Sequence, residues 1–264
     1  MLHDIQSVGD VLVAGVFDGH GGSAASTTAA RLMPNLMTEE LLGGQVTPRQ
    51  ALELAWETTC DTYRGGCDTM GNCLAEYDAV EGILLANTAA ADIVAGTTAS
   101  VAAIQGTDIT ILNCGDSRTL LVANNGNVEF VSKDHSPYEE LDRLLEGSDA
   151  GLDYSIPECS FGKWYMPMGE LTYAVSRSLE GSYVTSKGII SDPDVTSLRS
   201  IPGVLVIASD GLFEVMDNAQ VARQAARIKR RGIGASEAAK LLCAMAFDKG
   251  TSDNVSVVVV YLDG

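Results

Sequence analysis

Four aspartates stand beside short apolar runs of the sequence, where buried strands are expected to end. Asp18, Asp116 and Asp210 each follow such a run, and Asp253 precedes another. Carboxylates that converge at one rim of a sheet repel each other unless cations lie between them. Oxygen ligands of this kind suit Mg²⁺ and Mn²⁺. A single aspartate is more simply a turn or capping residue, but four in matching positions favour a metal site.

A histidine flanked by glycines lies two residues after the first of these aspartates. His20 belongs to the segment Asp18-Gly19-His20-Gly21-Gly22, which is not the setting of a core histidine. An imidazole beside a metal site can protonate a leaving oxygen. A lone histidine more often has no special role, but the glycine-rich context here favours a functional one.

Apolar runs bounded by turn residues predict the strands that would position these side chains. Asn124-Asn125-Gly126, between two of the runs, is a strong hairpin signal. The predicted strands cover residues 11–17, 97–104, 108–114, 119–123, 127–131, 171–175, 204–208 and 255–261. Because each aspartate adjoins one of these strands, we expect the strand ends to hold the site.

Longer segments with helical patterning lie between and after the strands. Thr47 and Pro48 fit the N-cap and the first position of one helix. The predicted helices cover residues 23–37, 48–64, 137–147, 218–231 and 235–247. We interpret 65–94 as a long irregular connection and 148–170 as a surface flap. Strands in runs and helices in groups predict an α+β fold rather than alternating βαβ units.

The chain is acidic, with 35 acidic and 17 basic residues among 264 and a net charge of −18. Such a surface disfavours nucleic acid and anionic membranes, and no run of apolar residues is long enough to predict a membrane span. The acidity is compatible with divalent cations, although solubility alone explains it equally well. The start lacks the basic and apolar regions of a signal peptide. We therefore expect an intracellular, cytoplasmic protein, with an organelle left open.

Six cysteines occur, and none of them forms a CxxC pair that would predict a zinc site. Cys60, Cys67 and Cys73 fall in one region and could meet in space. Reduced thiols of an intracellular protein are the simpler interpretation.

Five segments, in this order along the chain, resemble the metal-dependent serine/threonine phosphatases of the type 2C (PPM) family. The resemblance extends over nearly the whole chain. The segments are Val16-Phe17-Asp18-Gly19-His20-Gly21-Gly22, Gly96-Thr97-Thr98-Ala99, Asn113-Cys114-Gly115-Asp116-Ser117-Arg118, Ala208-Ser209-Asp210-Gly211-Leu212 and Ser252-Asp253-Asn254-Val255-Ser256-Val257.

This resemblance implies one domain over residues 1–264, with a central antiparallel β-sandwich flanked by a helix pair on each face. It also implies two Mg²⁺ or Mn²⁺ ions and a third, more weakly bound ion. Asp18 would bridge the two metals, and the carbonyl of Gly19 would bind one of them. Asp210 and Asp253 would complete the pair, and Asp116 would belong to the third site.

The resemblance further implies a phosphoprotein substrate. A metal-activated hydroxide would attack the phosphorus of phosphoserine or phosphothreonine in line, and His20 would protonate the departing oxygen as general acid. Neither a cysteine nor a serine of the enzyme has to act. Recognition of the substrate protein would come from the irregular segments 65–94 and 148–170.

The sequence departs from the family at its start and at two later positions. The family's first strand carries an arginine that holds the substrate phosphate, followed by Met-Glu-Asp, and neither has a match before Asp18. We therefore expect the usual N-terminal strand to be lacking, which makes the domain N-terminally short and leaves a sheet edge exposed to a partner. In addition, Leu179-Glu180-Gly181 stands where Leu-Gly-Asp is usual, and Glu214 replaces an aspartate.

Two functions compete on these grounds. The first is an active protein phosphatase, which the four aspartates and His20 favour. The second is a phosphatase-like binding or regulatory module that binds metals but turns over weakly or not at all, which the missing arginine and Met-Glu-Asp motif favour. A nucleotide- or nucleic-acid-binding protein is not indicated, because the sequence has no glycine-rich phosphate loop and no basic patch.

Overall fold

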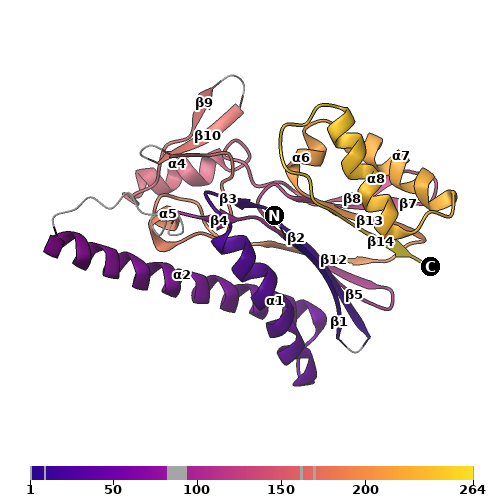
Figure 1. Ribbon diagram of the computed structural model, residues 1–264, viewed down its shortest axis with the longest axis horizontal. Coiled ribbons are helices and arrows are strands. Elements are labelled where there is room, and N and C mark those ends of the chain that lie inside the picture. Colours follow the sequence, from indigo (N-terminus) through magenta and orange to yellow (C-terminus); the bar gives the residue numbers. More distant parts are fainter. Residues whose placement is uncertain (1, 9, 82–93, 161–162, 169–170, 264) are drawn as a thin grey trace.

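Two antiparallel sheets face each other at the centre of the structure, and helices cover both outer faces (Figure 1). The computed structural model describes residues 2–8, 10–81, 94–160, 163–168 and 171–263. The layering confirms the predicted α+β sandwich with helices on both faces.

The first sheet has five strands in the order β1-β2-β5-β6-β12. Their bounds are β1 (Leu2–Val8), β2 (Val11–Phe17), β5 (Ala99–Gln105), β6 (Asp108–Cys114) and β12 (Asp194–Arg199). The bounds predicted for β2 and β6 are confirmed. β12 was not predicted, because its residues are half-buried or exposed and lack an apolar run.

The expected exposed edge at β2 is corrected by the structure. β1 pairs along the whole of β2, from Leu2 opposite Phe17 to Val8 opposite Val11, so β1 forms this edge of the sheet. A hairpin needs only a very short connection, so the few residues before Asp10 suffice for a strand. The arginine and Met-Glu-Asp of the family's first strand are still absent from the sequence of β1.

The second sheet has four strands in the order β14-β13-β7-β8. Their bounds are β14 (Val257–Leu262), β13 (Gly203–Ala208), β7 (Arg118–Ala123) and β8 (Val128–Val131). The predicted hairpin joins β7 to β8: the amide of Ala123 donates to the carbonyl of Asn127 over 2.9 Å, and Gly126 adopts a φ of 93°.

Successive side chains of each strand point to opposite faces of its sheet, and this alternation divides the core into layers. In β2, Ala14 and Val16 pack between the two sheets, whereas Val13 and Phe17 face the helices of the first sheet. In β13, Leu205 likewise lies between the sheets, and its neighbours face the opposite helices. Strands buried on both faces read as continuous apolar runs, which explains why they were predicted well.

Helices α1 (Ala24–Leu42) and α2 (Pro48–Glu81) cover the first sheet. Thr47 caps α2 as predicted: its hydroxyl accepts from the amide of Gln50 over 3.3 Å, and the Gln50 side chain accepts from the Thr47 amide over 2.9 Å. The predicted irregular connection is wrong for residues 65–81, which continue α2, and its remainder at 82–93 lies outside the described residues.

Helices α7 (Asn218–Arg230) and α8 (Ala235–Asp248) cover the second sheet, close to their predicted bounds. Within the described residues, no helix is long and apolar enough to cross a membrane.

The predicted flap contains a hairpin of β9 (Glu158–Ser160) and β10 (Lys163–Met168), and β10 also pairs with β11 (Leu171–Tyr173). In Figure 1 this hairpin projects from the end of the sandwich near β3 (Gly19–His20) and β4 (Gly96–Thr97). Helices α4 (Leu141–Asp149) and α5 (Ser182–Ser186) support it through a small separate core.

Candidate metal centre

The four predicted aspartates meet at one end of the sandwich. Asp18 follows β2 and Asp116 follows β6, so both come from the first sheet. Asp210 follows β13 as the first residue of the short helix α6 (Asp210–Phe213), and Asp253 lies shortly before β14, so both come from the second sheet. Each sheet therefore contributes two carboxylates.

All four aspartates, together with Gly19 and His20, line one cavity of about 320 Å³. Thr98 holds Asp18 in place at its wall. The Asp18 amide donates to the Thr98 hydroxyl over 3.2 Å, and the Thr98 amide donates to the Asp18 carbonyl over 2.9 Å. The same hydroxyl lies 2.6 Å from that of Ser117, one residue beyond Asp116.

Burial and mutual repulsion shift the acid–base equilibria of these carboxyls. Burial, followed by the charges of Asp210 and Asp253, raises the pKa of Asp18 from 3.8 to about 7. Burial, followed by the charge of Asp210, raises the pKa of Asp116 to about 8. Burial and the charges of Asp253 and Glu214 also raise the pKa of Asp210. Without cations, holding all these groups ionised costs free energy.

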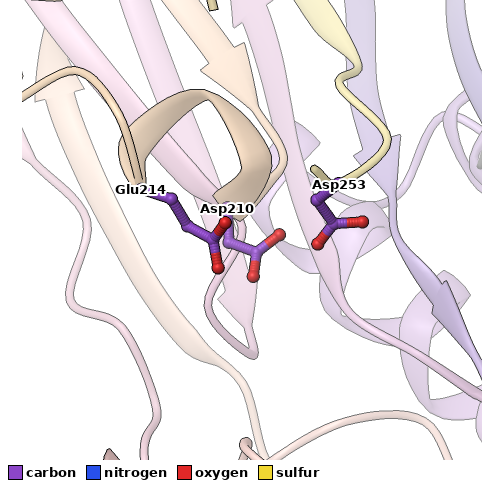
Figure 2. Close-up of side chains that lie close together, drawn as sticks. All are labelled: Asp210, Glu214 and Asp253. Atoms are coloured by element: carbon purple, nitrogen blue, oxygen red, sulfur yellow. The ribbon is translucent and has the colours of Figure 1, made fainter. Parts of the chain in front are cut away.

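A fifth carboxylate, Glu214, joins the second-sheet pair. Ligand oxygens of Asp210, Glu214 and Asp253 lie within 4.8 Å of each other. Figure 2 shows Asp210 and Glu214 side by side at α6, with Asp253 beside them from the loop before β14. One oxygen of Asp210, Oδ1, is buried and has no hydrogen-bond partner among the described residues. A hard divalent cation fits this oxygen-rich set, because it would satisfy the unpartnered atom and offset the repulsion.

Close backbone packing brings the two second-sheet loops together. A Cβ at Gly211 would lie 2.4 Å from the carbonyl oxygen of Asn254, which is closer than atoms can approach. Only glycine therefore allows the start of α6 to touch the segment that carries Asp253. This explains physically why a glycine follows Asp210.

His20 lies at the edge of the same cavity. Its Nε2 is 2.5 Å from Oε1 of Glu180, and its ring meets that of Tyr173 edge-on, with centroids 5.3 Å apart. Burial lowers the pKa of His20, but the charge and hydrogen bond of Glu180, followed by the charges of Asp116 and Asp18, raise it further, so the net shift is upward. These partners favour the protonated imidazole.

No site role was predicted from the sequence for Glu180 or Thr98, and Glu214 was connected with the third metal site only as a replacement for the family's aspartate. Glu214 and Glu180 were noticed only as departures from the family pattern, and Thr98 only as part of a matching segment. Helical spacing could have placed Glu214 beside Asp210, because residues four apart share a helix face. Nothing in the local pattern shows that Glu180 reaches His20, because their contact depends on the tertiary fold.

A family model described as "Protein phosphatase 2C" matches residues 5–255. The chain belongs to the protein phosphatase 2C family. Members of this family are metal-dependent protein phosphatases, in agreement with the acidic centre.

Individual relatives of this protein phosphatase 2C chain agree. The rice protein "Probable protein phosphatase 2C 68" is 31% identical over 255 residues, covering 94% of this chain and 67% of the rice protein. The bovine "Protein phosphatase 1L" is 28% identical, covering 98% of this chain and 66% of its own length. The chain thus spans about two thirds of these relatives.

The fold agrees as well. A crystal structure of a serine-threonine phosphatase 2C from Toxoplasma gondii superposes with a TM-score of 0.75 at 21% identity, covering 96% of this chain and 85% of that one.

Proposed function

We propose that residues 1–264 form one catalytic domain that hydrolyses phosphoserine and phosphothreonine in proteins. The observation that carries this proposal is the convergence of two carboxylates from each sheet in a single cavity. In the proposal, Asp18, the carbonyl of Gly19, Asp210 and Asp253 hold two Mg²⁺ or Mn²⁺ ions. Asp116 belongs to a third, weaker site.

The charge of the cavity supports a metal requirement. None of the described residues that line it is a lysine or an arginine. A phosphate group entering a space lined by four aspartates would be repelled unless cations neutralised them. Divalent cations, when bound, supply that charge and make a water molecule a better nucleophile. The chain's own carboxylates set where this chemistry takes place.

His20 is the proposed proton donor to the departing seryl or threonyl oxygen. It lines the cavity together with the four aspartates, and 29% of its side-chain surface is exposed. A general acid matters most when the leaving oxygen is strongly basic. Serine and threonine alkoxides are of this kind.

Hydrolysis of p-nitrophenyl phosphate with Mn²⁺ tests whether the centre is catalytic. We expect turnover that Asp18→Ala reduces by about 100-fold or more. Asp248→Ala serves as the matched control, because Asp248 is an exposed aspartate at the end of α8 and does not line the cavity. Wild-type activity no higher than that of Asp18→Ala would show a metal-binding regulatory module instead.

The role of His20 is tested by varying the leaving group. We expect His20→Ala to lose about 100-fold in kcat on a phosphothreonine peptide. It should lose far less on p-nitrophenyl phosphate, whose leaving group needs no proton. An equal loss on both substrates would show that His20 is not the acid.

A further inference from the structure

Glu180 is a buried carboxylate with an unusual set of partners. Its side chain is fully buried. Oε1 lies 2.5 Å from Nε2 of His20 and accepts a hydrogen bond of 2.5 Å from the hydroxyl of Ser178. The other oxygen, Oε2, is buried and has no hydrogen-bond partner in the part of the chain that the structure describes. Among the described residues no lysine or arginine forms an ion pair with it, so His20 is the one cationic group at hand.

A carboxylate that is fully buried, with a histidine as its cationic neighbour and one oxygen unsatisfied, is costly in a protein interior, so stability alone is a weak reason for it. An apolar residue or a glutamine would satisfy the same space at lower cost. The arrangement is understandable if the carboxylate acts on the imidazole that it contacts.

The backbone fixes the geometry of this contact. His20 in β3 pairs directly with Gly96 in β4, and Thr97 pairs in turn with Leu179 through mutual hydrogen bonds of 2.9 and 3.0 Å. A Cβ at residue 96 would lie 2.0 Å from Oε1 of Glu180. The glycine therefore gives the carboxylate its path past β4 to the imidazole.

The imidazole is held from a second direction as well. Tyr173 meets the ring of His20 at an interplanar angle of 84°, and its hydroxyl donates to the carbonyl of Val94 over 3.1 Å. The ring of His20 is thus restrained by Glu180 through its Nε2 atom and by Tyr173 through an aromatic contact.

We propose that Glu180 is the positioning residue of His20. It determines which nitrogen of the ring keeps its proton and which one exchanges a proton with the substrate. The carboxylate accepts a hydrogen bond from Nε2–H, so Nδ1 is the nitrogen that exchanges a proton with the substrate. When Nδ1–H gives its proton to the departing alkoxide, the neutral ring keeps its remaining proton on Nε2. Water then returns a proton to Nδ1. This inference rests on the proposed function of His20.

Glu180→Gln tests the inference by replacing the anionic acceptor with a neutral amide of the same shape. We expect kcat on a phosphothreonine peptide to fall about 10- to 100-fold with KM unchanged, and turnover of p-nitrophenyl phosphate to change little. In the His20→Ala background, the same substitution should cause no further loss of leaving-group selectivity. Glu129→Gln is the control, because Glu129 is an exposed carboxylate on β8 that does not line the cavity.

The ring tautomer gives a second, independent measurement. Long-range ¹H–¹⁵N NMR of the wild-type protein above neutral pH should show His20 protonated at Nε2, and Glu180→Leu, which leaves Nε2–H without this acceptor, should weaken that preference. A wild-type ring protonated at Nδ1 would overturn the inference even if the variant did not fold. So would a folded Glu180→Gln protein with wild-type leaving-group selectivity. If His20→Ala loses kcat equally on both substrates, the proposed general acid role of His20 is wrong. In that case the tautomer measurement alone tests whether Glu180 orients the ring.

Discussion

At the level of residues, the centre stores unfavourable charge in the metal-free protein. Asp18 and Asp116 have pKa values raised to about 7 and about 8, above their usual value of 3.8. At pH values between the usual pKa of 3.8 and the raised values, the folded state therefore binds more protons than the unfolded state. Ionising the groups destabilises the metal-free fold, and its stability should rise as the pH falls from about 8 toward 5.

Asp210→Asn should show separately how this charge affects the stability of the metal-free protein and the affinity for Mn²⁺. Removing one carboxylate relieves repulsion with Asp253 and Glu214. We expect the metal-free variant to gain about 1 kcal/mol in the free energy of unfolding at pH 7.5, while Mn²⁺ affinity falls about 10-fold or more. Urea unfolding and titration calorimetry measure the two quantities.

An exposed control, Asp248→Asn, should change neither quantity. Loss of stability in metal-free Asp210→Asn would mean that the carboxylate is needed for folding itself, and would contradict this account of the centre.

The site residues divide into those that local sequence can indicate and those that it cannot. The four aspartates were predictable, because each adjoins a strand whose apolar run is unmistakable. His20 was predictable from the glycines around it. Glu180 was not, because it is separated from His20 by 160 positions and meets it only after β3, β4 and the 179–180 segment are aligned.

At the level of elements, α2 shows where patterns mislead. Gly65 and Gly66 were interpreted as the end of the helix, since glycine weakens helices. The buried residues Trp56, Tyr63 and Cys67 nevertheless continue one face of α2 against the first sheet, and packing outweighs propensity. β12 was not predicted because its sequence has no strand pattern of its own. Its pairing with β6 makes it a strand.

Replacing both glycines with alanine should stabilise α2. A Cβ at Gly65 or Gly66 would meet nothing within 4 Å, and both positions are exposed. Each alanine should therefore add roughly 0.5–1 kcal/mol to the free energy of unfolding, measured by urea denaturation. Gly211→Ala is the contrasting control and should destabilise the protein, since its Cβ has no room. No gain from the double alanine variant would indicate that α2 ends before these positions in solution.

Glu140, which precedes α4, binds Arg177 in the segment between β11 and α5. Its carboxylate accepts from Arg143 over 2.8 Å and also from Arg177. Burial opposes ionisation, but the hydrogen bonds from Arg177 and Arg143 lower the pKa of Glu140 from 4.5 to about 2. A carboxyl with a depressed pKa stabilises the fold above its unfolded pKa, and this stabilisation declines as the pH falls toward the folded value.

Glu140→Gln should therefore destabilise the protein by about 2–4 kcal/mol at pH 7, because it removes the buried anion that Arg143 and Arg177 share and leaves Arg177 only its longer pair with Asp194. The difference from wild type should shrink as the pH is lowered from about 5 toward 3. Urea midpoints at several pH values measure this trend. A difference that stays constant with pH would show that shape rather than charge explains the effect.

At the level of the whole molecule, the metal centre joins the two sheets. Asp18 and Asp116 belong to one sheet, and Asp210 and Asp253 belong to the other. A cation bound between them links the two halves of the sandwich, so its binding free energy adds to the stability of the whole fold. This arrangement also offsets part of the self-repulsion of a chain with a net charge of −18.

Thermal unfolding should therefore depend on the concentration of Mn²⁺. At 100 times the dissociation constant, one bound ion adds about 2.7 kcal/mol to the free energy of unfolding. We expect Tm to rise with the logarithm of Mn²⁺ concentration, and Asp18→Asn and Asp253→Asn, one in each sheet, to abolish most of the rise. If only one of the two variants lost it, the ion would be held by a single sheet.

The buried thiols allow local opening of the core to be measured by chemical labelling. Burial raises the pKa of Cys60, on the buried face of α2, to about 12 and places that of Cys114 well above its usual range, so neither forms a reactive thiolate in the closed protein. Alkylation of each should wait for its layer to open. Exposed Cys159 provides the fast reference rate. Both thiols lie in the layer between the first sheet and helices α1 and α2, so we expect mass spectrometry to show them labelled together when that layer opens, far more slowly than Cys159.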